Sequence, residues 1–462
     1  MTTPNLLRRE PSTPGGARAA APVRIVHLGL GNFFRAHQAW YTDCAPDANQ
    51  WGIAAFTGRS TALADALTAQ DGLYTLITRA ADGDTARVVA SVSRALPGGD
   101  TASWLGYFAD PAVAIVTLTV TEAGYVRGPS GSLDLDHPAV QADLAALRAD
   151  RAAAVGTTPA RLVAGLAARR AAGVDGIAIV SCDNLPDNGA ITAAVVGDFA
   201  AALEPALAGW ISEQASFVTT MVDRITPANA ADDDASAEAL TGSTDHAAVV
   251  TEPYAEWVLS GRFPAGRPGW DAVGARFVED ITPFEERKLW LLNGGHSLLA
   301  YAGSGRGLLT IADAMADPTC VGWLEQWWAE ASAHLTLPAA ELASYRQALL
   351  ERFANPRIRH LLAQIAADGS QKLPIRVLPA IVAERAAGRP ATGGLRVLAA
   401  WINHLRGASA PVKDVAAHEL CQLAAGPLLS AVPAVLSSLG SALADDEGAV
   451  TTIVTVADEL HG

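Results

Sequence analysis

Residues 23–34 read VRIVHLGLGNFF, a β-branched run that passes directly into a glycine-rich turn. Gly29 and Gly31 would let the backbone turn tightly and come close to a pyrophosphate, and a helix beginning after the turn would offer unpaired N–H groups to that anion. Phe34 stands where the dinucleotide-binding fingerprint has its third glycine. Taken alone, this turn fits a nucleotide site and an ordinary strand-to-helix connection equally well.

Similar β-rich runs recur up to about residue 280, and Ala- and Leu-rich helical stretches such as Ala190–Leu207 lie between several of them. Strands that alternate with helices predict a mostly parallel sheet with helices on both faces, which is a Rossmann-like α/β arrangement. The predicted strands are Val23–Leu28, Gly52–Phe56, Tyr74–Thr78, Val113–Val120, Ile177–Val180 and Phe217–Val222.

After Pro283 the β-branched runs become sparse and helical periodicity takes over, as in Ala339–Phe353. This half is predicted to be an all-α domain. The first 22 residues mix Pro, Gly, Thr and Arg without an apolar block of signal-peptide length, which is typical of a loose tail. The expected organisation is a disordered tail at 1–22, a Rossmann-like dinucleotide-binding domain at 23–283 and a helical domain at 284–462.

Composition indicates a globular protein, because 50% of the 462 residues are hydrophobic and 18% are charged. With 33 Lys and Arg against 48 Asp and Glu, the net charge of −15 disfavours a broad surface for nucleic acid or anionic lipid. The four cysteines form no CxxC pair, which argues against a zinc motif or a disulfide framework and favours the reducing cytoplasm. Oligomeric state is not predicted, since no heptad run is present.

One uncharged stretch, Cys421–Ala444, is long enough to cross a bilayer. Its prolines, glycines and serines instead favour buried helices with a break, so no membrane span is expected.

The end of the second predicted strand leaves the cofactor open. Residues 57–59 read Thr-Gly-Arg, with no carboxylate to accept a ribose hydroxyl. Arg59 fits a contact with the 2′-phosphate of NADP as well as a solvated surface position.

A second segment, PFEERKLWLLNGGHSLLAYAG at residues 283–303, contains several polar side chains that are candidates for catalysis or substrate binding. On a regular α-helix with Lys288 at zero, Glu285 lies near 60°, His296 near 80° and Asn293 at about 140°, so the four share one face. Ordinary roles are also open: an ion pair of Glu285 with Lys288, a core His296, and Asn293 as a cap. The adjacent Gly294-Gly295 pair fits close approach of a ligand or an interrupted helix.

Together these segments resemble the long-chain polyol-specific dehydrogenases, the family that includes mannitol dehydrogenases and hexuronate reductases. The likeness spans roughly residues 25–379. Its landmarks are Gly29 to His37 (GLGNFFRAH), Asp71 to Tyr74 (DGLY), Thr121 to Tyr125 (TEAGY), Ser181 to Asn184 (SCDN), Met221 to Pro227 (MVDRITP) and the block of Lys288, Asn293 and His296.

The resemblance implies metal-independent hydride transfer between a nicotinamide cofactor and a secondary alcohol or ketone. Lys288 matches the family's general acid/base, which needs a pKa lowered toward neutrality. Asn184 and Asn293 match the pair that donates hydrogen bonds to the developing alkoxide. His296 matches a substrate-orienting residue, and Glu285 corresponds to a proton-relay position.

The resemblance also implies a cofactor site for NAD, with NADP as the alternative. Gly29 and Gly31 resemble the phosphate turn, and Asn32, Phe33 and Arg35 continue it into the first helix. Thr121 and Glu122 would follow a strand at the ligand-binding edge of the sheet; a helix cap or a surface charge is the alternative for Glu122. The landmark pair Asp223 and Arg224 fits a structural ion pair as well as a functional role.

The C-terminal half would bind the substrate. Lys372 resembles a family lysine that contacts it, and Gln364 stands near where mannitol-oxidising members have an arginine. The sequences of residues 283–303 and 368–379 resemble fructuronate reductase more closely. The substrate of that enzyme is a hexuronate, and Lys372 or Arg376 would pair with its carboxylate. Both could instead flank a surface helix. We therefore predict reduction of fructuronate to mannonate; a neutral polyol such as mannitol or arabinitol, or a nucleotide-binding regulator without turnover, is the alternative.

Overall fold

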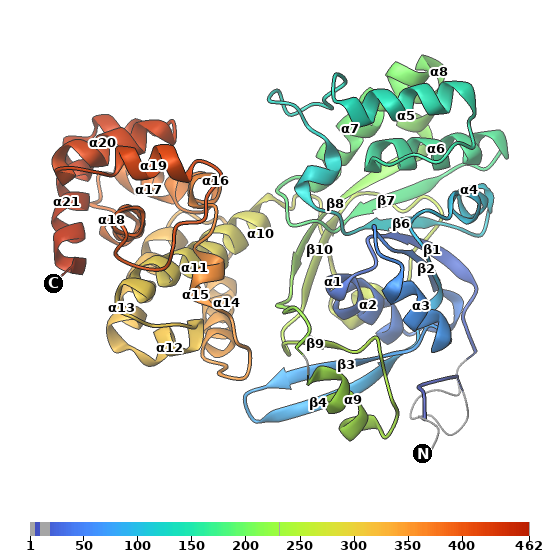
Figure 1. Ribbon diagram of the computed structural model, residues 1–462, viewed down its shortest axis with the longest axis horizontal. Coiled ribbons are helices and arrows are strands. Elements are labelled where there is room, and N and C mark those ends of the chain that lie inside the picture. The colour runs from blue at the N-terminus through green and yellow to red at the C-terminus, as the bar shows by residue number, and fades with distance from the viewer. Residues whose placement is uncertain (1–4, 10–18, 231, 462) are drawn as a thin grey trace. The chain divides into compact units, whose positions relative to one another are not determined.

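The computed structural model describes residues 5–9, 19–230 and 232–461 (Figure 1). The chain divides into two compact units, Met1–Ile281 and Thr282–Gly462. Each unit is described below by itself.

The first unit is built on an eight-stranded sheet in the order β11-β10-β8-β7-β6-β1-β2-β5. Neighbouring strands run parallel except for β10, which pairs antiparallel with β8. The predicted mostly parallel sheet is thus confirmed. The strands are β1 (Val23–Leu28), β2 (Gly52–Phe56), β5 (Val92–Leu96), β6 (Ile115–Leu118), β7 (Ile177–Ser181), β8 (Ala215–Asp223), β10 (Glu256–Ser260) and β11 (Arg276–Phe277).

Successive side chains of each strand point to opposite faces of this sheet, and a hydrophobic cluster covers each face. Val26 and Leu28 of β1 belong to one hydrophobic cluster, and Ile25 belongs to the cluster on the other face. Figure 1 shows the helices divided between the two faces accordingly. The first cluster includes α4 (Thr101–Ala109), α5 (Pro138–Ala149), α6 (Thr158–Ala171), α7 (Asn188–Leu203) and α8 (Pro205–Gln214), and the second includes α1 (Asn32–Ala36), α2 (Gln38–Cys44), α3 (Ala62–Ala69) and the 3₁₀ turn η3 (Trp270–Val273).

A second, three-stranded sheet corrects one prediction. The run at Tyr74–Thr78 forms β3 (Tyr74–Ala80), which pairs antiparallel with β4 (Gly83–Val89) and parallel with β9 (Val249–Thr251). It therefore does not belong to the main sheet, where β5 takes the edge position beside β2. Helix α9 (Asp233–Thr241) packs against β3 and β4.

Two further expectations need correction. The predicted helix Ala190–Leu207 is broken, because Pro205 begins α8 with the chain extended at Glu204. The predicted tail is ordered in part: Leu7 is fully buried, and Arg9 donates hydrogen bonds to the carbonyl oxygens of Ala90 and Val92. Residues 1–4 and 10–18 of that tail lie outside the described residues.

The second unit is helical throughout residues 282–461 apart from its loops and an isolated β-bridge between Thr310 and Leu361, which confirms the predicted all-α half. Its central helix is α18 (Thr392–Leu405), against which α13, α21 and η5 pack. The other elements are α10 (Thr282–Arg287), the π-helices η4 (Lys288–Asn293) and η5 (Leu299–Gly303), α11 (Gly294–Leu298), α12 (Ile311–Ala316), α13 (Pro318–Ser332), α14 (Ala339–Phe353), α15 (Leu362–Ile365), α16 (Gly369–Arg376), α17 (Leu378–Ala386), α19 (Ala417–Leu423), α20 (Leu428–Ser438), η6 (Ala442–Asp445) and α21 (Glu447–His461).

The uncharged stretch Cys421–Ala444 is divided among α19, α20 and η6. Across the part of the chain that the structure describes, every helix is too short or too polar to traverse a bilayer.

Candidate active site

The glycine-rich turn follows β1 at the carboxyl edge of the parallel sheet, and its two glycines do different things. Gly29 has φ +107°, and a Cβ there would clash with the carbonyl oxygen of Thr119 in the neighbouring β6 loop. At Gly31 a Cβ would meet only the Gly29 carbonyl oxygen, at 3.5 Å. Gly29 therefore lets two loops pack together, whereas Gly31 leaves the open backbone that close approach of a phosphate requires.

Phe34, which replaces the third glycine of the fingerprint, packs against β1 itself. Its ring stacks on that of His27 with centroids 3.6 Å apart. Nδ1 of His27 contacts the Thr117 hydroxyl at 2.8 Å and Nε2 contacts the Thr119 hydroxyl at 3.1 Å. Burial lowers the pKa of His27 to about 3, so its ring is neutral. An aromatic stack thus fixes the start of the first helix where other dinucleotide folds use a glycine.

The residues that continue the turn hold the loop in place. The buried Arg35 guanidinium donates to the carbonyl oxygens of Ala247 and Gly31 and, at 2.6 Å, to Oδ1 of Asn32. Asn32 donates to the Pro227 carbonyl oxygen at 3.2 Å. The structure thus gives Arg35 a supporting role, and its predicted contact with a cofactor stays a prediction.

Phe33 is half-buried and stacks on His37 with centroids 5.0 Å apart. Arg224, one of the landmark residues, is also structural: its guanidinium is buried, donates at 2.6 Å to the Ala36 carbonyl oxygen and lies over the Trp40 ring.

Asp183 ties together the loops that carry three predicted site residues. Its carboxylate accepts hydrogen bonds from the backbone N–H of Val120 and from the Tyr125 hydroxyl. Thr121 and Glu122 lie between these two anchors and are exposed. Burial raises the pKa of Asp183 to about 6. One buried carboxyl group thus fixes the β6 loop to the β7 loop.

Asn184 follows Asp183 directly and is exposed. The loop that carries it is fixed from behind by Asn188, whose amide donates to the carbonyl oxygens of Asp183 at 2.9 Å and Thr220 at 2.8 Å. Asn184 therefore stands on a rigid loop at the carboxyl edge of the sheet, the edge where parallel sheets bind ligands.

In the second unit the four predicted residues lie on one nearly continuous helical segment, from α10 to η5. Glu285, Lys288 and Asn293 are half-buried, whereas Trp290, Leu291, Leu292 and the residues from Gly294 to Gly303 are buried. His296, the fourth predicted residue, belongs to this buried range, with 7% of its surface exposed. The structure thus brings these four residues onto one segment whose remaining surface forms the core of the unit.

The segment is not the regular α-helix that we expected. Lys288–Asn293 is a π-helix, and the Gly294 N–H donates to the carbonyl oxygen of Leu289, five residues back. In an α-helix Lys288 and Asn293 would be separated by about 140°. In a π-helix, residues five apart are joined by one backbone hydrogen bond and lie on the same side. The wider helix brings the candidate base and the candidate amide together more closely than predicted.

The Gly294-Gly295 pair serves packing rather than a ligand. A Cβ at Gly294 would meet Cζ2 of Trp327 at 2.8 Å, and one at Gly295 would meet Nε1 of Trp328 at 3.1 Å. Both indoles are buried in α13. The two glycines therefore admit two tryptophan rings against the helix backbone.

His296 is held by aromatic contacts. Its ring stacks on Phe353 with centroids 4.4 Å apart and meets the edge of the His360 ring at 5.0 Å. Burial lowers the pKa of His360. These contacts fix the orientation of the His296 ring, as a substrate-orienting residue requires.

Lys372 and Arg376 both lie on α16, which packs against η4 and α11. Lys372 Nζ donates to the carbonyl oxygens of Ile365 and Ala367, and burial lowers its pKa. Burial also lowers the pKa of Arg376 to about 10, and within the described residues no hydrogen bond reaches its Nε. Lys372 is therefore partly engaged in structure, whereas Arg376 is a desolvated cation with a donor to spare.

Sequence reasoning missed the residues that support this segment, namely Trp327, Trp328, Phe353 and His360. The adjacent tryptophans of α13 were a usable signal, since two large polar-edged rings in succession need hydrogen-bond acceptors when buried. The contacts of Phe353 and His360 depend on how α14 folds back, which no local pattern reveals.

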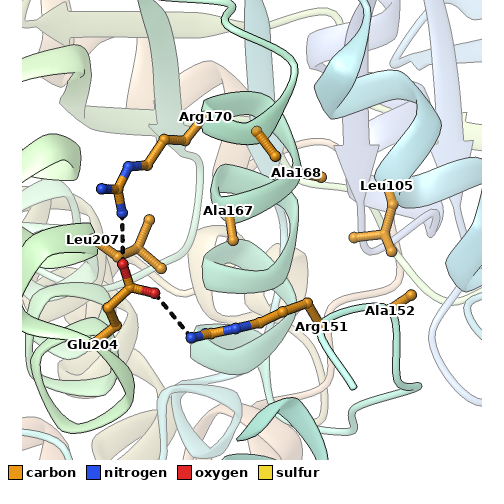
Figure 2. A pocket seen from close by; sticks show the side chains of 9 residues that line it. Leu105, Arg151, Ala152, Ala167, Ala168, Arg170, Glu204 and Leu207 are labelled. Atoms are coloured by element: carbon orange, nitrogen blue, oxygen red, sulfur yellow. Dashed lines mark hydrogen bonds and ion pairs between the residues drawn. The ribbon is translucent and has the colours of Figure 1, made fainter. Parts of the chain in front are cut away.

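A cavity of about 460 Å³ lies elsewhere, between α4, α6 and the start of α8 (Figure 2). Alanines of α6 line it, and Glu204 pairs there with Arg151 at 2.9 Å and Arg170 at 2.8 Å. The Glu204 carboxylate is already neutralised by two guanidinium groups, and the other side chains that line the cavity are apolar. The cavity therefore offers no group suited to proton transfer. It is not the candidate site.

Comparison with known proteins supports the same two-part organisation. A family model described as the mannitol dehydrogenase Rossmann domain matches residues 23–272, and one described as the mannitol dehydrogenase C-terminal domain matches residues 280–457. The chain is 42% identical over 386 residues to the uncharacterized oxidoreductase YdfI of Escherichia coli (strain K12), covering 79% of this chain and 77% of that protein.

Two further relatives carry functional names. The chain is 40% identical over 365 residues to the D-mannonate oxidoreductase of Escherichia coli (strain K12), covering 77% of this chain and 74% of that protein. Among solved structures, Pseudomonas fluorescens mannitol 2-dehydrogenase in a ternary complex with NAD and D-mannitol matches with a TM-score of 0.81 at 33% identity, covering 99% of this chain and 94% of that one.

Proposed function

Because this chain belongs to the mannitol dehydrogenase family of oxidoreductases, we propose that it interconverts a keto sugar acid and its secondary alcohol, namely fructuronate and mannonate, with NAD. The observation that carries the proposal is the position of Lys288 and Asn293, both half-buried and five residues apart on one π-helix within an otherwise largely buried segment. A cation beside an amide suits proton transfer to an oxygen that becomes an alkoxide.

The chain's own residues would handle the proton and the developing negative charge. In the reducing direction the Lys288 ammonium gives its proton to the carbonyl oxygen while the carbonyl carbon gains a hydride. The amides of Asn184 and Asn293 donate hydrogen bonds to that oxygen as charge develops on it. His296 orients the substrate, and Glu285, three residues before Lys288, passes the replacement proton from solvent.

The cofactor site fits the open turn of the first unit. The backbone at Gly31 and Asn32 would receive the pyrophosphate, and Thr121 and Glu122 would border it at the same sheet edge. When bound, the nicotinamide supplies or accepts the hydride. NADP is the alternative, because β2 ends without a carboxylate and Arg59 is exposed.

Arg376 favours a uronate over a neutral polyol. A guanidinium that is desolvated, and whose Nε has no hydrogen bond within the described residues, gains most from an anionic partner. A hexuronate carboxylate supplies that charge, whereas mannitol and arabinitol do not. Lys372 on the same helix would reach the substrate's hydroxyl groups.

Lys288→Ala tests the reaction. A positioned acid/base contributes about 10²- to 10⁴-fold, so kcat should fall by that factor while the Kd for NADH stays unchanged. Lys413→Ala, an exposed lysine of the same unit, is the matched control and should behave as wild type. Turnover by Lys288→Ala at the wild-type rate would show that this lysine is not the acid/base.

A substrate panel separates the alternatives. Fructuronate and tagaturonate are compared with fructose and xylulose, each with NADH and NADPH, and the uronates should be reduced preferentially. Reduction of the neutral ketoses alone would establish a polyol dehydrogenase. Binding of NADH without turnover of any substrate, in wild type and Lys288→Ala alike, would establish a regulator. Prior dialysis against EDTA should change none of the rates, since the acid/base is an amine; among the described residues no cluster of three metal-binding side chains is found.

A further inference from the structure

We propose that Trp327 and Trp328 are positioning residues of the active site, because their indole N–H groups hold Lys288–Asn293 in its π-helical form. The proposal rests on the function proposed for Lys288 and Asn293. It assigns a role in the reaction to two side chains that lie on another helix, α13.

The two indoles donate to successive carbonyl groups of the π-helix. Nε1 of Trp327 lies 2.9 Å from the carbonyl oxygen of Trp290, and Nε1 of Trp328 lies 2.8 Å from that of Leu291. In a π-helix each carbonyl group accepts from the N–H five residues later instead of four, and the Gly294 N–H accordingly bonds to the carbonyl groups of Leu289 and Leu291 and not to that of Trp290. The Trp327 indole therefore supplies a donor to the carbonyl group that Gly294 has left, and the Trp328 indole adds a second donor to the Leu291 carbonyl.

A third carbonyl group of the segment accepts a hydrogen bond from a side chain of the same segment. The Ser297 hydroxyl donates to the carbonyl oxygen of Asn293 at 3.0 Å. Side-chain donors therefore reach three carbonyl groups at and near the junction with α11. The Ser297 bond spans four residues and suits either helix, whereas the indole bond to the Trp290 carbonyl favours the wide helix, because in the α-helical form the Gly294 N–H would occupy that carbonyl.

Packing fixes Trp327 from the opposite side as well. Its ring lies between Gly294 and Gly394, where a Cβ would come within 2.8 Å and 3.1 Å of the indole. The Glu330 carboxylate, one turn further along α13, accepts hydrogen bonds from the backbone N–H groups of Gly393 at 2.8 Å and Gly394 at 2.9 Å. Helix α13 is thus held by the N-terminus of α18, so its indoles are presented at a fixed distance from η4.

The consequence for the site is the relative direction of Lys288 and Asn293. If the segment relaxed to an α-helix, these side chains would diverge to about 140°. A shift of about 1 Å in a reacting group can cost about 10²-fold in rate. The indoles therefore act on the reaction through the register of the helix and not through contact with the substrate.

The test removes the indole N–H donors and keeps an aromatic ring at each position. In Trp327→Phe/Trp328→Phe we expect kcat to fall about 10²-fold, the limb of the pH–rate profile that reports Lys288 to shift, and the Kd for NADH to stay unchanged. Trp323→Phe, on the same helix beneath Arg306 and Arg396, is the matched control and should retain the wild-type rate and profile. Benzothienylalanine at positions 327 and 328, which replaces only the indole N–H by sulfur, gives the same comparison if the double Phe variant does not fold.

A crystal structure of the variant would show the backbone hydrogen bonds of residues 288–294 directly. The Gly294 N–H should move from the Leu289 carbonyl oxygen to that of Trp290, which is the α-helical bond. A retained π-helix, or a wild-type rate and pH profile, would overturn the proposal. Lys288→Ala measured in parallel separates the two hypotheses: if it is inactive while the tryptophan variants match wild type, only the positioning role fails, and if it is fully active, the proposed function fails first.

Discussion

Asp183 shows how a single buried carboxyl group can organise a loop that carries a candidate catalytic residue. It is 4% exposed, accepts hydrogen bonds from Val120 and Tyr125, and precedes Asn184 directly. Burial nevertheless raises its pKa to about 6, because the hydrogen bonds do not fully replace the lost solvation of the charged form. The loop is therefore held by a group whose ionisation opposes folding.

Asp183→Asn should change how the stability of the first unit depends on pH. Because the folded pKa lies above the ordinary value of 3.8, the stabilising contribution of the wild-type carboxyl is fully present below that value and is lost as the pH rises through about 6. Relative to Asp183→Asn, the wild type should lose about 2 kcal/mol of stability between pH 4 and pH 7. Urea unfolding followed by circular dichroism at several pH values measures this difference.

Asp271→Asn is the control for that experiment. The pKa of Asp271 is lowered by its hydrogen bond from Arg267, so its contribution is lost as the pH falls, which is the opposite sign. A constant difference between wild type and Asp183→Asn across this pH range would show that Asp183 is not titrating in the folded protein.

At the residue scale, local sequence patterns nominate candidate catalytic groups, whose roles stay predictions, but do not reveal the residues that hold those groups in place. Lys288, Asn293 and Asn184 stand in short motifs that can be read locally. The partner of Phe34 is His27 seven residues earlier, and the anchors of Asp183 lie 58 and 63 residues away. Such contacts depend on strand order, which the residue types alone do not determine.

At the scale of elements, the segment from α10 to η5 departs from its predicted regular helix for a reason that local sequence does not contain. The residues 288–293 are ordinary helix formers, and nothing in them favours a π-helix. The donors that stabilise the wide form come from α13, 37 residues later. The Gly294-Gly295 pair was a visible sign of close approach, although the approaching groups are indoles and not a ligand.

Gly294→Ala should destabilise the protein although alanine favours helices. Its Cβ would meet Cζ2 of Trp327 at 2.8 Å and the backbone carbonyl oxygen of Arg376 at 3.0 Å, neither of which can move freely, so we expect a cost of about 1–3 kcal/mol. Gly322→Ala on α13 has open space at its Cβ and should stabilise by about 1 kcal/mol. Chemical denaturation of both variants provides the measurement. Stabilisation by both would mean that the indoles do not press on the backbone at Gly294.

At the scale of the whole molecule, the alternation of strands and helices was sufficient to predict a mostly parallel sheet followed by a helical half. It was not sufficient to assign every strand. The run at Tyr74–Ala80 has the composition of a sheet strand, but its partner β9 lies some 170 residues later and draws it into a second sheet. The short strands β10 and β11 extend the main sheet without a strong periodic signal of their own.

The proposed function requires residues of both units to act on one oxygen atom, which a double-mutant cycle can test in the intact chain. Asn184→Ala and Asn293→Ala should each lower kcat by about 10²- to 10³-fold as one donor to the alkoxide is lost. Groups that share one partner couple by about 0.5–3 kcal/mol. We expect the second loss to be smaller than the first, because water entering the vacated place partly solvates the oxygen.

Asn49→Ala, at an exposed asparagine of the first unit in η1 (Ala48–Gln50), supplies the uncoupled reference. Combined with Asn293→Ala it should change kcat no more than Asn293→Ala alone, because a distant surface amide shares no partner with the reacting oxygen. If the fold-loss of the Asn184/Asn293 double variant equals the product of the two single losses, as expected for the reference pair, the two amides do not act on the same oxygen atom. A wild-type rate for Asn184→Ala would remove the first unit from oxyanion stabilisation and leave Asn293 alone to supply it.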